Sequence, residues 1–312
     1  MANIGRGLST LSLDVDASDR PHLSFQSEPA ANSYGLGYAR WDGAQWLIEE
    51  IVSGQPDSNN GGYSRLRLDS QGEPHVLYAT ATVLSYAGRT ASGWVSETVA
   101  AERPASLVGL DIDPADVPHA VAVFGSELRL YRRLASGWAH ETIGSGMIEG
   151  PDIALDHQGA AHVVYSRRSP SQAIIYARRG SSGWVLTELA AGSSARIAVG
   201  PDGRPQVVYS NGRGTSSHTR FDGAQWVTQQ LATSSNGIAI GVSSSGSPAI
   251  AHNTRAAMAT LTFHIGESTG WRSEQIHASG LWPSEVVFDG NGTPWVAFFD
   301  TTTNDIRVAH QE

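Results

Sequence analysis

The chain has 312 residues, a formal net charge of −9 and no apolar run near the ~20 residues that a membrane helix needs. The acidic balance argues against a general nucleic-acid binder, which would need a basic stripe along the phosphates. Cysteine and lysine are both absent, which excludes disulfides, thiolate metal sites, cysteine nucleophiles and lysine Schiff bases. Any anion site must therefore use arginine, histidine or backbone N–H groups.

Short apolar runs separated by turn residues recur along the chain. In the first run Leu13 and Val15 alternate with Ser12 and Asp14, and later first runs alternate in the same way. A two-residue period is typical of β-strands, and no segment keeps a helical period. The clearest repeat, residues 153–189, holds four runs in order: IALD, AHVVYS, AIIYARR and GWVLTEL. We interpret each repeat as four antiparallel strands.

A hairpin between the first and second strands recurs seven times. In chain order it reads DASDRPH (16–22), DSQGEPH (69–75), DPADVPH (113–119), DHQGAAH (156–162), GPDGRPQ (200–206), SSSGSPA (243–249) and DGNGTPW (289–295). The first four copies carry an aspartate at the first position and a histidine at the last, and the next two carry neither residue at these positions. We expect the carboxylate to accept a hydrogen bond from the imidazole N–H across the turn and so to fix the hairpin.

The hairpin histidines do not form a metal site in this interpretation. They belong to different repeats, about one sheet spacing of ~10 Å apart, whereas zinc–nitrogen bonds are about 2 Å long. We therefore expect no metal and no cofactor. In the seventh copy Trp295 stands where histidine is expected, opposite Asp289. It either fills the gap or marks a functional position.

A tryptophan opens the fourth strand of six repeats. These residues are Trp46, Trp94, Trp138, Trp184, Trp226 and Trp271, spaced by 42 to 48 residues. A four-stranded repeat of ~40–45 residues is typical of a β-propeller blade. We therefore predict an all-β fold, a seven-bladed propeller of four-stranded antiparallel blades, and a single domain over residues 1–312.

The seventh repeat ends after three predicted strands. An open ring would leave two exposed sheet edges, which is an aggregation hazard. We predict that the N-terminal residues 1–8, MANIGRGL, supply the missing outer strand and close the ring. The alternative is a three-stranded last blade with a frayed N-terminus.

Polar residues differ from repeat to repeat at the start of the first strand. Four residues before each hairpin aspartate, or the residue in its place, the chain has Ser12, Arg65, Gly109, Asp152, Arg196, Ala239 and Glu285. We expect these residues near the rim opposite the hairpins, where the axial channel opens. His252 replaces a tyrosine of other repeats, and Trp282 falls on the same rim. Distinct polar and aromatic residues on a uniform scaffold indicate a ligand site. The alternative is a solvated channel mouth whose charges only pair with one another.

Two groups of proteins within the β-propeller superfamily resemble this chain in architecture. Sialidase-like propellers carry the hairpin motif Ser-x-Asp-x-Gly-x-x-Trp, which the segment LDSQGEPHVLY (68–78) resembles in position only. Its glycine comes three residues after the aspartate, and a histidine replaces the aromatic residue. Arg65, Arg196 and Glu285 match the sialidase catalytic residues in type alone. Propeller lectins are similar in repeat number and aromatic content.

Three functions are compatible with these residues. The first is carbohydrate binding by a lectin-like protein at the axial channel mouth, with Trp282 stacking on a sugar and Arg65, Asp152, Arg196 and Glu285 as polar contacts. The second is a polysaccharide hydrolase or lyase at the same rim. Asp152 and Glu285 would be its carboxylate pair, or His252 and Arg196 its base and uronate partner. The third is a protein-interaction scaffold. The expected partner is a glycan or another small molecule, and no catalytic residue is assigned.

Overall fold

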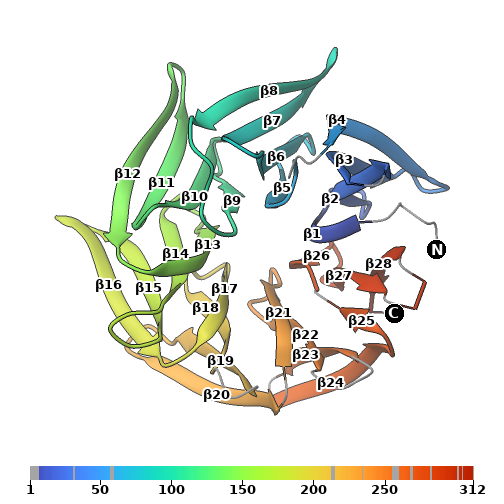
Figure 1. The fold of residues 1–312 in the computed structure, drawn as a ribbon. Coiled ribbons are helices and arrows are strands. Elements are labelled where there is room, and N and C mark those ends of the chain that lie inside the picture. The colour runs from blue at the N-terminus through green and yellow to red at the C-terminus, as the bar shows by residue number, and fades with distance from the viewer. Residues whose placement is uncertain are drawn as a thin grey trace.

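The computed structural model describes residues 7–30, 32–56, 60–211, 215–233, 235–254, 260–267, 270–281, 283–300, 302–303 and 305–311. Seven antiparallel sheets are arranged around a central channel, which confirms the predicted seven-bladed propeller (Figure 1). Across the described ranges no helix is long and apolar enough to span a membrane.

The strands follow one another from the channel to the outer edge of each blade. The first two blades comprise β1 (Gly7–Val15), β2 (Pro21–Ala30), β3 (Ser33–Trp41), β4 (Trp46–Pro56), and β5 (Ser64–Leu68), β6 (Pro74–Ala79), β7 (Leu84–Thr90), β8 (Gly93–Ala100). The next two comprise β9 (Gly109–Ile112), β10 (Pro118–Phe124), β11 (Glu127–Leu134), β12 (Gly137–Ser145), and β13 (Ile148–Leu155), β14 (Ala161–Arg167), β15 (Ala173–Gly180), β16 (Gly183–Ala190). The fifth and sixth comprise β17 (Ser193–Val199), β18 (Pro205–Ser210), β19 (Thr215–Phe221), β20 (Trp226–Thr233), and β21 (Ser235–Val242), β22 (Pro248–Thr254), β23 (Leu261–Glu267), β24 (Gly270–His277).

The seventh blade is built differently. It contains β25 (Gly280–Leu281), β26 (Val286–Phe288), β27 (Pro294–Asp300) and β28 (Asp305–His310). Both β25 and β26 pair with the same side of β27, so they form two pieces of one inner strand, and the sheet is three strands wide. The prediction that the N-terminus supplies its fourth strand is wrong for Gly7 and Leu8. Both belong to β1, where Gly7 pairs with Ser27, and residues 1–6 lie outside the described part of the chain.

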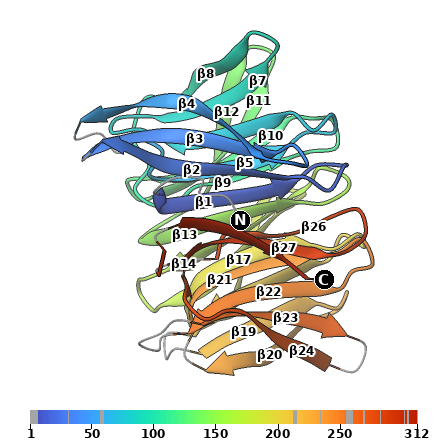
Figure 2. The ribbon, with the colours of Figure 1, turned by 90° about the vertical axis from the view of Figure 1, so that its right-hand side faces the viewer.

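The ring is closed by packing of the first blade against the last. Strand β1 lies beside β26 and β27 (Figure 2). The carboxylate of Asp19 accepts hydrogen bonds from the Gly290 N–H at 2.9 Å and from Asn291 Nδ2 at 3.0 Å, which joins the hairpins of the two blades. Face-to-face contact between blades therefore replaces a shared sheet at the closure.

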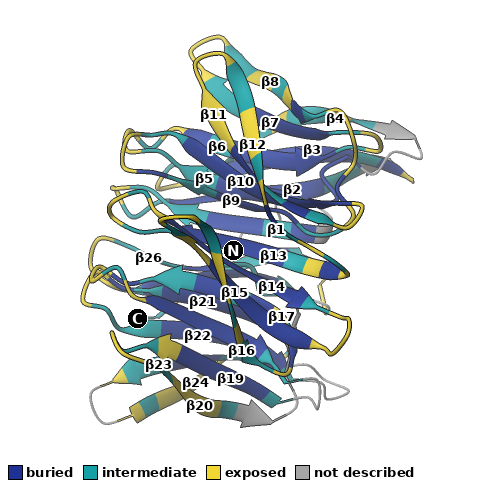
Figure 3. Ribbon diagram, turned by 90° about the vertical axis from the view of Figure 1, so that its left-hand side faces the viewer, coloured by how far each residue is buried: buried dark blue, intermediate teal, exposed yellow. Residues whose placement is uncertain are grey.

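Apolar residues between neighbouring blades form the core. Residues of the inner three strands of each blade are mostly buried. In the outer strands, partly buried residues alternate with exposed ones (Figure 3). The repeat tryptophans belong to this packing. Trp94 contacts Tyr38 of the preceding blade edge-on at 5.1 Å, and its indole N–H donates to Glu49 at 3.0 Å. Trp138 repeats both contacts with Tyr86 and Glu97, so these tryptophans join blades.

The predicted aspartate–histidine pairing in the hairpins is confirmed. His75 Nε2 lies 3.1 Å from Asp69 Oδ2 and His119 Nε2 lies 3.2 Å from Asp113 Oδ2, with longer contacts in the other two copies. The second carboxylate oxygen accepts backbone N–H groups within the same turn. In the seventh blade the indole N–H of Trp295 donates to Asp289 Oδ2 at 2.9 Å. Trp295 thus fills the place of the histidine.

We expect His162→Ala to lower the free energy of unfolding by about 1–3 kcal/mol, because it leaves Asp156 and the Tyr176 hydroxyl without their buried partner. Urea denaturation measures the change. His157→Ala, on the exposed turn of the same hairpin, is the matched control and should stay within about 0.5 kcal/mol of the unsubstituted protein. Equal stability of both variants would contradict the structural role of His162.

Candidate functional site

The inner strand of each blade is a sheet edge, so part of its backbone N–H groups face the channel without a strand partner. Acidic side chains of the preceding blade accept hydrogen bonds from some of them. These bonds run from Leu68 N to Asp14 Oδ2 (2.8 Å), Leu155 N to Asp111 Oδ2 (2.7 Å), Ile197 N to Asp152 Oδ2 (3.0 Å) and Leu13 N to Glu285 Oε2 (3.3 Å). Each carboxylate therefore connects two neighbouring blades at the channel wall.

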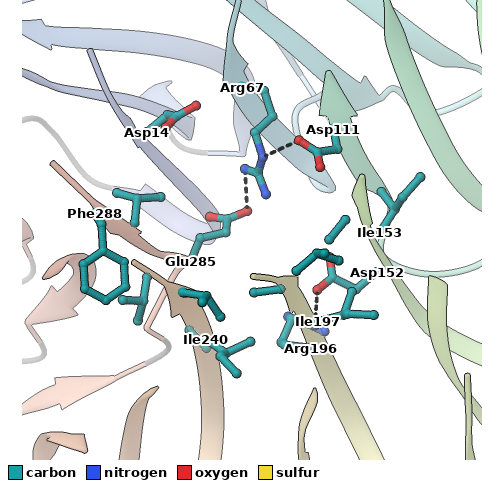
Figure 4. Close-up of a pocket in the computed structure, with 18 of the residues that line it drawn as sticks. Asp14, Arg67, Asp111, Asp152, Ile153, Arg196, Ile197, Ile240, Glu285 and Phe288 are labelled. Atoms are coloured by element: carbon teal, nitrogen blue, oxygen red, sulfur yellow. Dashed lines mark hydrogen bonds and ion pairs between the residues drawn. The ribbon is translucent and has the colours of Figure 1, made fainter. Parts of the chain in front are cut away.

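A cavity of about 370 Å³ occupies the channel between these carboxylates. Its charged lining comprises Asp14, Arg67, Asp111, Asp152, Arg196 and Glu285, and its apolar lining includes Ile153, Ile197, Ile240, Val286 and Phe288 (Figure 4). The cavity also reaches Ser244 and Asp289, which lie in hairpin turns. It thus extends toward the hairpin rim, whereas the sequence argument expected the ligand site at the opposite rim.

Arg67 projects into the middle of the cavity between two carboxylates (Figure 4). Its Nε lies 3.6 Å from Asp111 Oδ1 and its Nη1 lies 3.5 Å from Glu285 Oε1. Burial opposes the positive charge, but the nearby carboxylates outweigh burial and raise the pKa of Arg67. Arg67 is therefore a fixed cation at the centre of the channel.

Glu285 holds a second arginine as well. Its Oε1 lies 3.2 Å from Arg65 Nε and accepts a hydrogen bond from the Ser12 hydroxyl at 3.1 Å. Burial favours the protonated form, but Arg65 and Arg67 together outweigh burial, so the pKa of Glu285 is lowered. Glu285 is thus an ionised link among several blades.

The pKa values of Asp14 and Asp111 are shifted upward, in contrast to that of Glu285. Burial raises the pKa of both carboxyl groups, although the nearby Arg67 and the backbone N–H donors act against it. These two groups therefore keep a proton to higher pH than an ordinary aspartate does. A protonated carboxyl group can donate a hydrogen bond to a ligand oxygen as well as accept one.

Arg196 differs from the other channel arginines in its partners. Its Nη1 donates to the Ala195 carbonyl at 2.9 Å, and no carboxylate of the described residues lies within ion-pair distance. Burial lowers the pKa of Arg196, although the charge of Asp152 acts against it. The side chain lies deep in the channel yet stays partly accessible, because it faces the cavity. Arg196 is therefore a cavity-lining cation whose hydrogen bond to the Ala195 carbonyl involves Nη1 alone.

The structure brings three of the predicted site residues to this cavity: Asp152, Arg196 and Glu285. Arg65 is not among the residues that line the cavity, but it forms an ion pair with Glu285, which does line it. His252 does not join them, because it is buried in β22 and stacked on His264 with ring centroids 4.7 Å apart. Trp282 lies outside the described residues.

Sequence reasoning missed Asp14, Arg67 and Asp111. Each lies two residues before a hairpin aspartate, on the same strand face as the residues that were singled out. The two-residue period was therefore the signal that could have found them. Among the described residues no three histidine, aspartate or glutamate side chains are placed to hold a metal ion.

Comparisons with known proteins agree on the architecture alone. No family model and no curated protein matches the chain. AofleA from Arthrobotrys oligospora is 12% identical over 88% of this chain and 87% of its own, with a TM-score of 0.61. The fucose-binding lectin of Aleuria aurantia, a six-bladed propeller, is 15% identical over 88% and 98%, with a TM-score of 0.60. A putative 6-phosphogluconolactonase from Bacteroides fragilis is 13% identical over 96% and 93%, with a TM-score of 0.61.

The chain shares the β-propeller fold with these proteins. At such low identity the likeness extends to the fold and not to individual site residues. The blade number also differs, since this chain has seven blades and the Aleuria lectin six. The sialidase-like interpretation finds no support in these comparisons.

Proposed function

We propose that the protein binds a carbohydrate in the axial cavity. The observation that carries this proposal is Arg196, a cation that lines the cavity and has no carboxylate within ion-pair distance among the described residues. Sugar hydroxyls need donors and acceptors together, and Asp152 and Asp111 supply acceptors nearby. Ile240 and Phe288 offer an apolar surface to a sugar ring. The proteins of similar fold include fucose-binding lectins and a putative lactonase of a sugar acid, which supports this ligand class.

An acidic sugar fits this cavity better than a neutral one. Arg196 has no ion pair in the described structure, so a ligand carboxylate would gain a charge-assisted contact there. The carboxylates near Arg67 already neutralise that second cation. We therefore expect a uronic acid to bind more tightly than the corresponding neutral sugar.

A hydrolase is the second candidate, favoured by one observation. Asp14 and Asp111 have raised pKa values, as a general acid requires. The pair first predicted, Asp152 and Glu285, suits catalysis less well. Arg65 and Arg67 outweigh the burial of Glu285 and lower its pKa, which is the opposite of what a general acid needs. The lyase version also lacks its base, because His252 is not at the cavity.

We expect Arg196→Gln to weaken binding of an acidic oligosaccharide about tenfold or more, since hydrogen bonds to charged groups contribute about 1.5–3 kcal/mol. Native mass spectrometry with a panel of neutral and acidic oligosaccharides reports bound and cleaved sugar together. Arg272→Gln, on the outer strand β24, is the matched control and should bind as the unsubstituted protein does.

The same spectra separate the candidate functions. Intact sugar retained at one per chain supports the proposal, and shortened products that have gained water would favour a hydrolase. A panel that leaves the protein unliganded, or equal binding by both arginine variants, would contradict carbohydrate recognition by Arg196. A protein-interaction scaffold would then be the better hypothesis.

A further inference from the structure

The hairpin histidines of three blades have a second polar partner on the third strand. The hydroxyl of Tyr38 lies 2.6 Å from His22 Nδ1, and that of Tyr176 lies 2.6 Å from His162 Nδ1. Tyr86 makes the same contact with His75 in the second blade. Because Nε2 of each histidine faces a hairpin carboxylate, Nε2 carries the proton and Nδ1 accepts a hydrogen bond from the tyrosine.

The third blade lacks this tyrosine. In the first blade Arg40 lies opposite His22 in the register of strands β2 and β3, and Tyr38 stands two residues before Arg40. In the third blade Arg132 pairs with His119, and the residue two positions before Arg132 is Leu130. Leucine therefore occupies the place where three other blades have a tyrosine ring and hydroxyl.

Two buried polar atoms are left without partners around Leu130. His119 is 6% exposed, its Nε2 faces Asp113, and its Nδ1 has no hydrogen-bond partner within the continuous described segment 60–211. In the next blade the indole N–H of Trp184 is also buried without an acceptor. Trp138, the corresponding tryptophan one blade earlier, donates its indole N–H to Glu97. Its ring packs edge-on against Tyr86, the counterpart of Leu130. Unpartnered buried groups of this kind are rare in folded proteins.

The residues that carry these atoms, His119 and Trp184, line a cavity of about 430 Å³ between the third and fourth blades, which we name the third-blade pocket. Its lining includes His119, Leu130, Leu134, Ala161 and Trp184, together with the polar side chains of Arg132, His140, Glu141 and the half-exposed Arg179. The volume lies within the ~300–1,000 Å³ typical of small-molecule sites. Apolar side chains and an indole ring form most of its wall, so the pocket favours a ring with few polar substituents over a polyhydroxylated sugar.

Burial keeps His119 neutral near pH 7. Its pKa is lowered chiefly by burial, although Asp113 acts against this. The neutral ring donates through Nε2 to Asp113, so Nδ1 can only accept. The missing partner is therefore a donor, such as a hydroxyl group on a ring placed as the tyrosine ring is in the other blades.

We propose that the third-blade pocket binds a small phenolic compound, whose hydroxyl donates to His119 Nδ1 and whose ring packs against Leu130 and Trp184. The ligand supplies the aromatic ring and the hydroxyl group that Leu130 does not provide. A second oxygen on the ring can accept a hydrogen bond from the unpartnered Trp184 indole N–H. A dihydroxybenzene therefore binds at least as tightly as a monophenol. This site is separate from the axial cavity and does not depend on the function proposed there.

Isothermal titration calorimetry with p-cresol tests the proposal. We expect one site per chain, and binding of toluene, which has the ring without the hydroxyl, at least tenfold weaker. Leu130→Tyr places a tyrosine in the pocket and should abolish p-cresol binding while raising the melting temperature. Leu130→Phe, which fills the same space without a hydroxyl, should also abolish binding and covers the case in which Leu130→Tyr does not fold.

A matched gain-of-site variant is available in the next blade. Tyr176→Leu reproduces the third-blade arrangement, since it leaves His162 Nδ1 without its donor and removes the ring that contacts Trp226. The expected stoichiometry rises from one to two p-cresol molecules per chain. The proposal is overturned if p-cresol does not bind, if Leu130→Tyr and Leu130→Phe bind it as well as the unsubstituted protein, or if a neutral sugar displaces it from the pocket.

Discussion

Glu285→Ala is expected to lower the free energy of unfolding by about 3 kcal/mol, the low end of the range for breaking a buried ion pair. The carboxylate faces Arg65 and Arg67, and it accepts the Ser12 hydroxyl and the Leu13 N–H. Its removal leaves Arg65 buried beside no other carboxylate of the described residues. Arg67 keeps its contact with Asp111, which is why we expect the lower end of the range.

Urea denaturation of Glu285→Ala measures this effect. Glu97→Ala is the control, because Glu97 also contacts an arginine and a tryptophan N–H but lies at the surface, with 34% of its side chain exposed. A surface ion pair contributes at most about 1 kcal/mol. A Glu285→Ala protein no less stable than Glu97→Ala would show that the channel arginines do not need this carboxylate.

Glu285→Gln separates the structural role from a catalytic one. If Glu285 were only a catalytic carboxylate, this variant would lose turnover and keep the stability of the unsubstituted protein. The contacts with Arg65 and Arg67 instead predict a clear loss of stability, since the amide keeps hydrogen bonding and loses the charge. We therefore expect the ion pairs of Glu285 with Arg65 and Arg67 to stabilise the contact between the last blade and the first two.

The propeller was predictable because its signals are local and repeated. The alternation of Leu13 and Val15 with polar residues follows the strand period, and each tryptophan such as Trp94 marks the same place in a blade. The pairing of Asp69 with His75 was predictable because aspartate and histidine are present together or absent together at these positions in the first six hairpins. Repetition supplied the comparison that a single sequence otherwise lacks.

The candidate site was only partly predictable, since it depends on contacts between blades. Whether Glu285 holds a ligand or two arginines is decided by side chains about 220 residues away in sequence. The strand register is likewise needed before Leu130 can be recognised as the replacement for a tyrosine. His252 stood out as unusual, but its strand directs it to a buried stack with His264 and away from the cavity.

The second large effect is a fall in the free energy of unfolding at acidic pH. We expect acidification from pH 7 to pH 5 to destabilise the protein through His218 and His252, two buried histidines. Burial lowers the pKa of both to about 4, with Arg220 adding to the effect on His218 and His264 to that on His252. An unfolded histidine has a pKa of about 6.5. Between these values the unfolded chain binds protons that the folded protein does not, so the free energy of unfolding falls as the pH falls.

At pH 5 the loss amounts to about 2 kcal/mol for each histidine, on the order given by proton linkage. The stability is fully present above pH 6.5 and is lost as the pH approaches 4. The hairpin carboxylates such as Asp69 have lowered pKa values and lose their contribution only at more acidic pH. Asp14 and Asp111 have raised pKa values and act in the opposite direction. His22, His119, His162 and His264 have pKa values lowered by burial and add to the loss of stability.

Replacement by tyrosine isolates the histidine contribution. Tyrosine occupies the position of His218 in three other blades, as Tyr176 shows, and the position of His252 in three, as Tyr165 shows. Tyrosine does not titrate in this range, and burial raises the pKa of Tyr165 further. His218→Tyr and His252→Tyr should therefore each reduce the difference in unfolding free energy between pH 7 and pH 5 by about 2 kcal/mol. If both variants keep the full difference, the acid sensitivity comes from other groups and these histidines are not held neutral by burial.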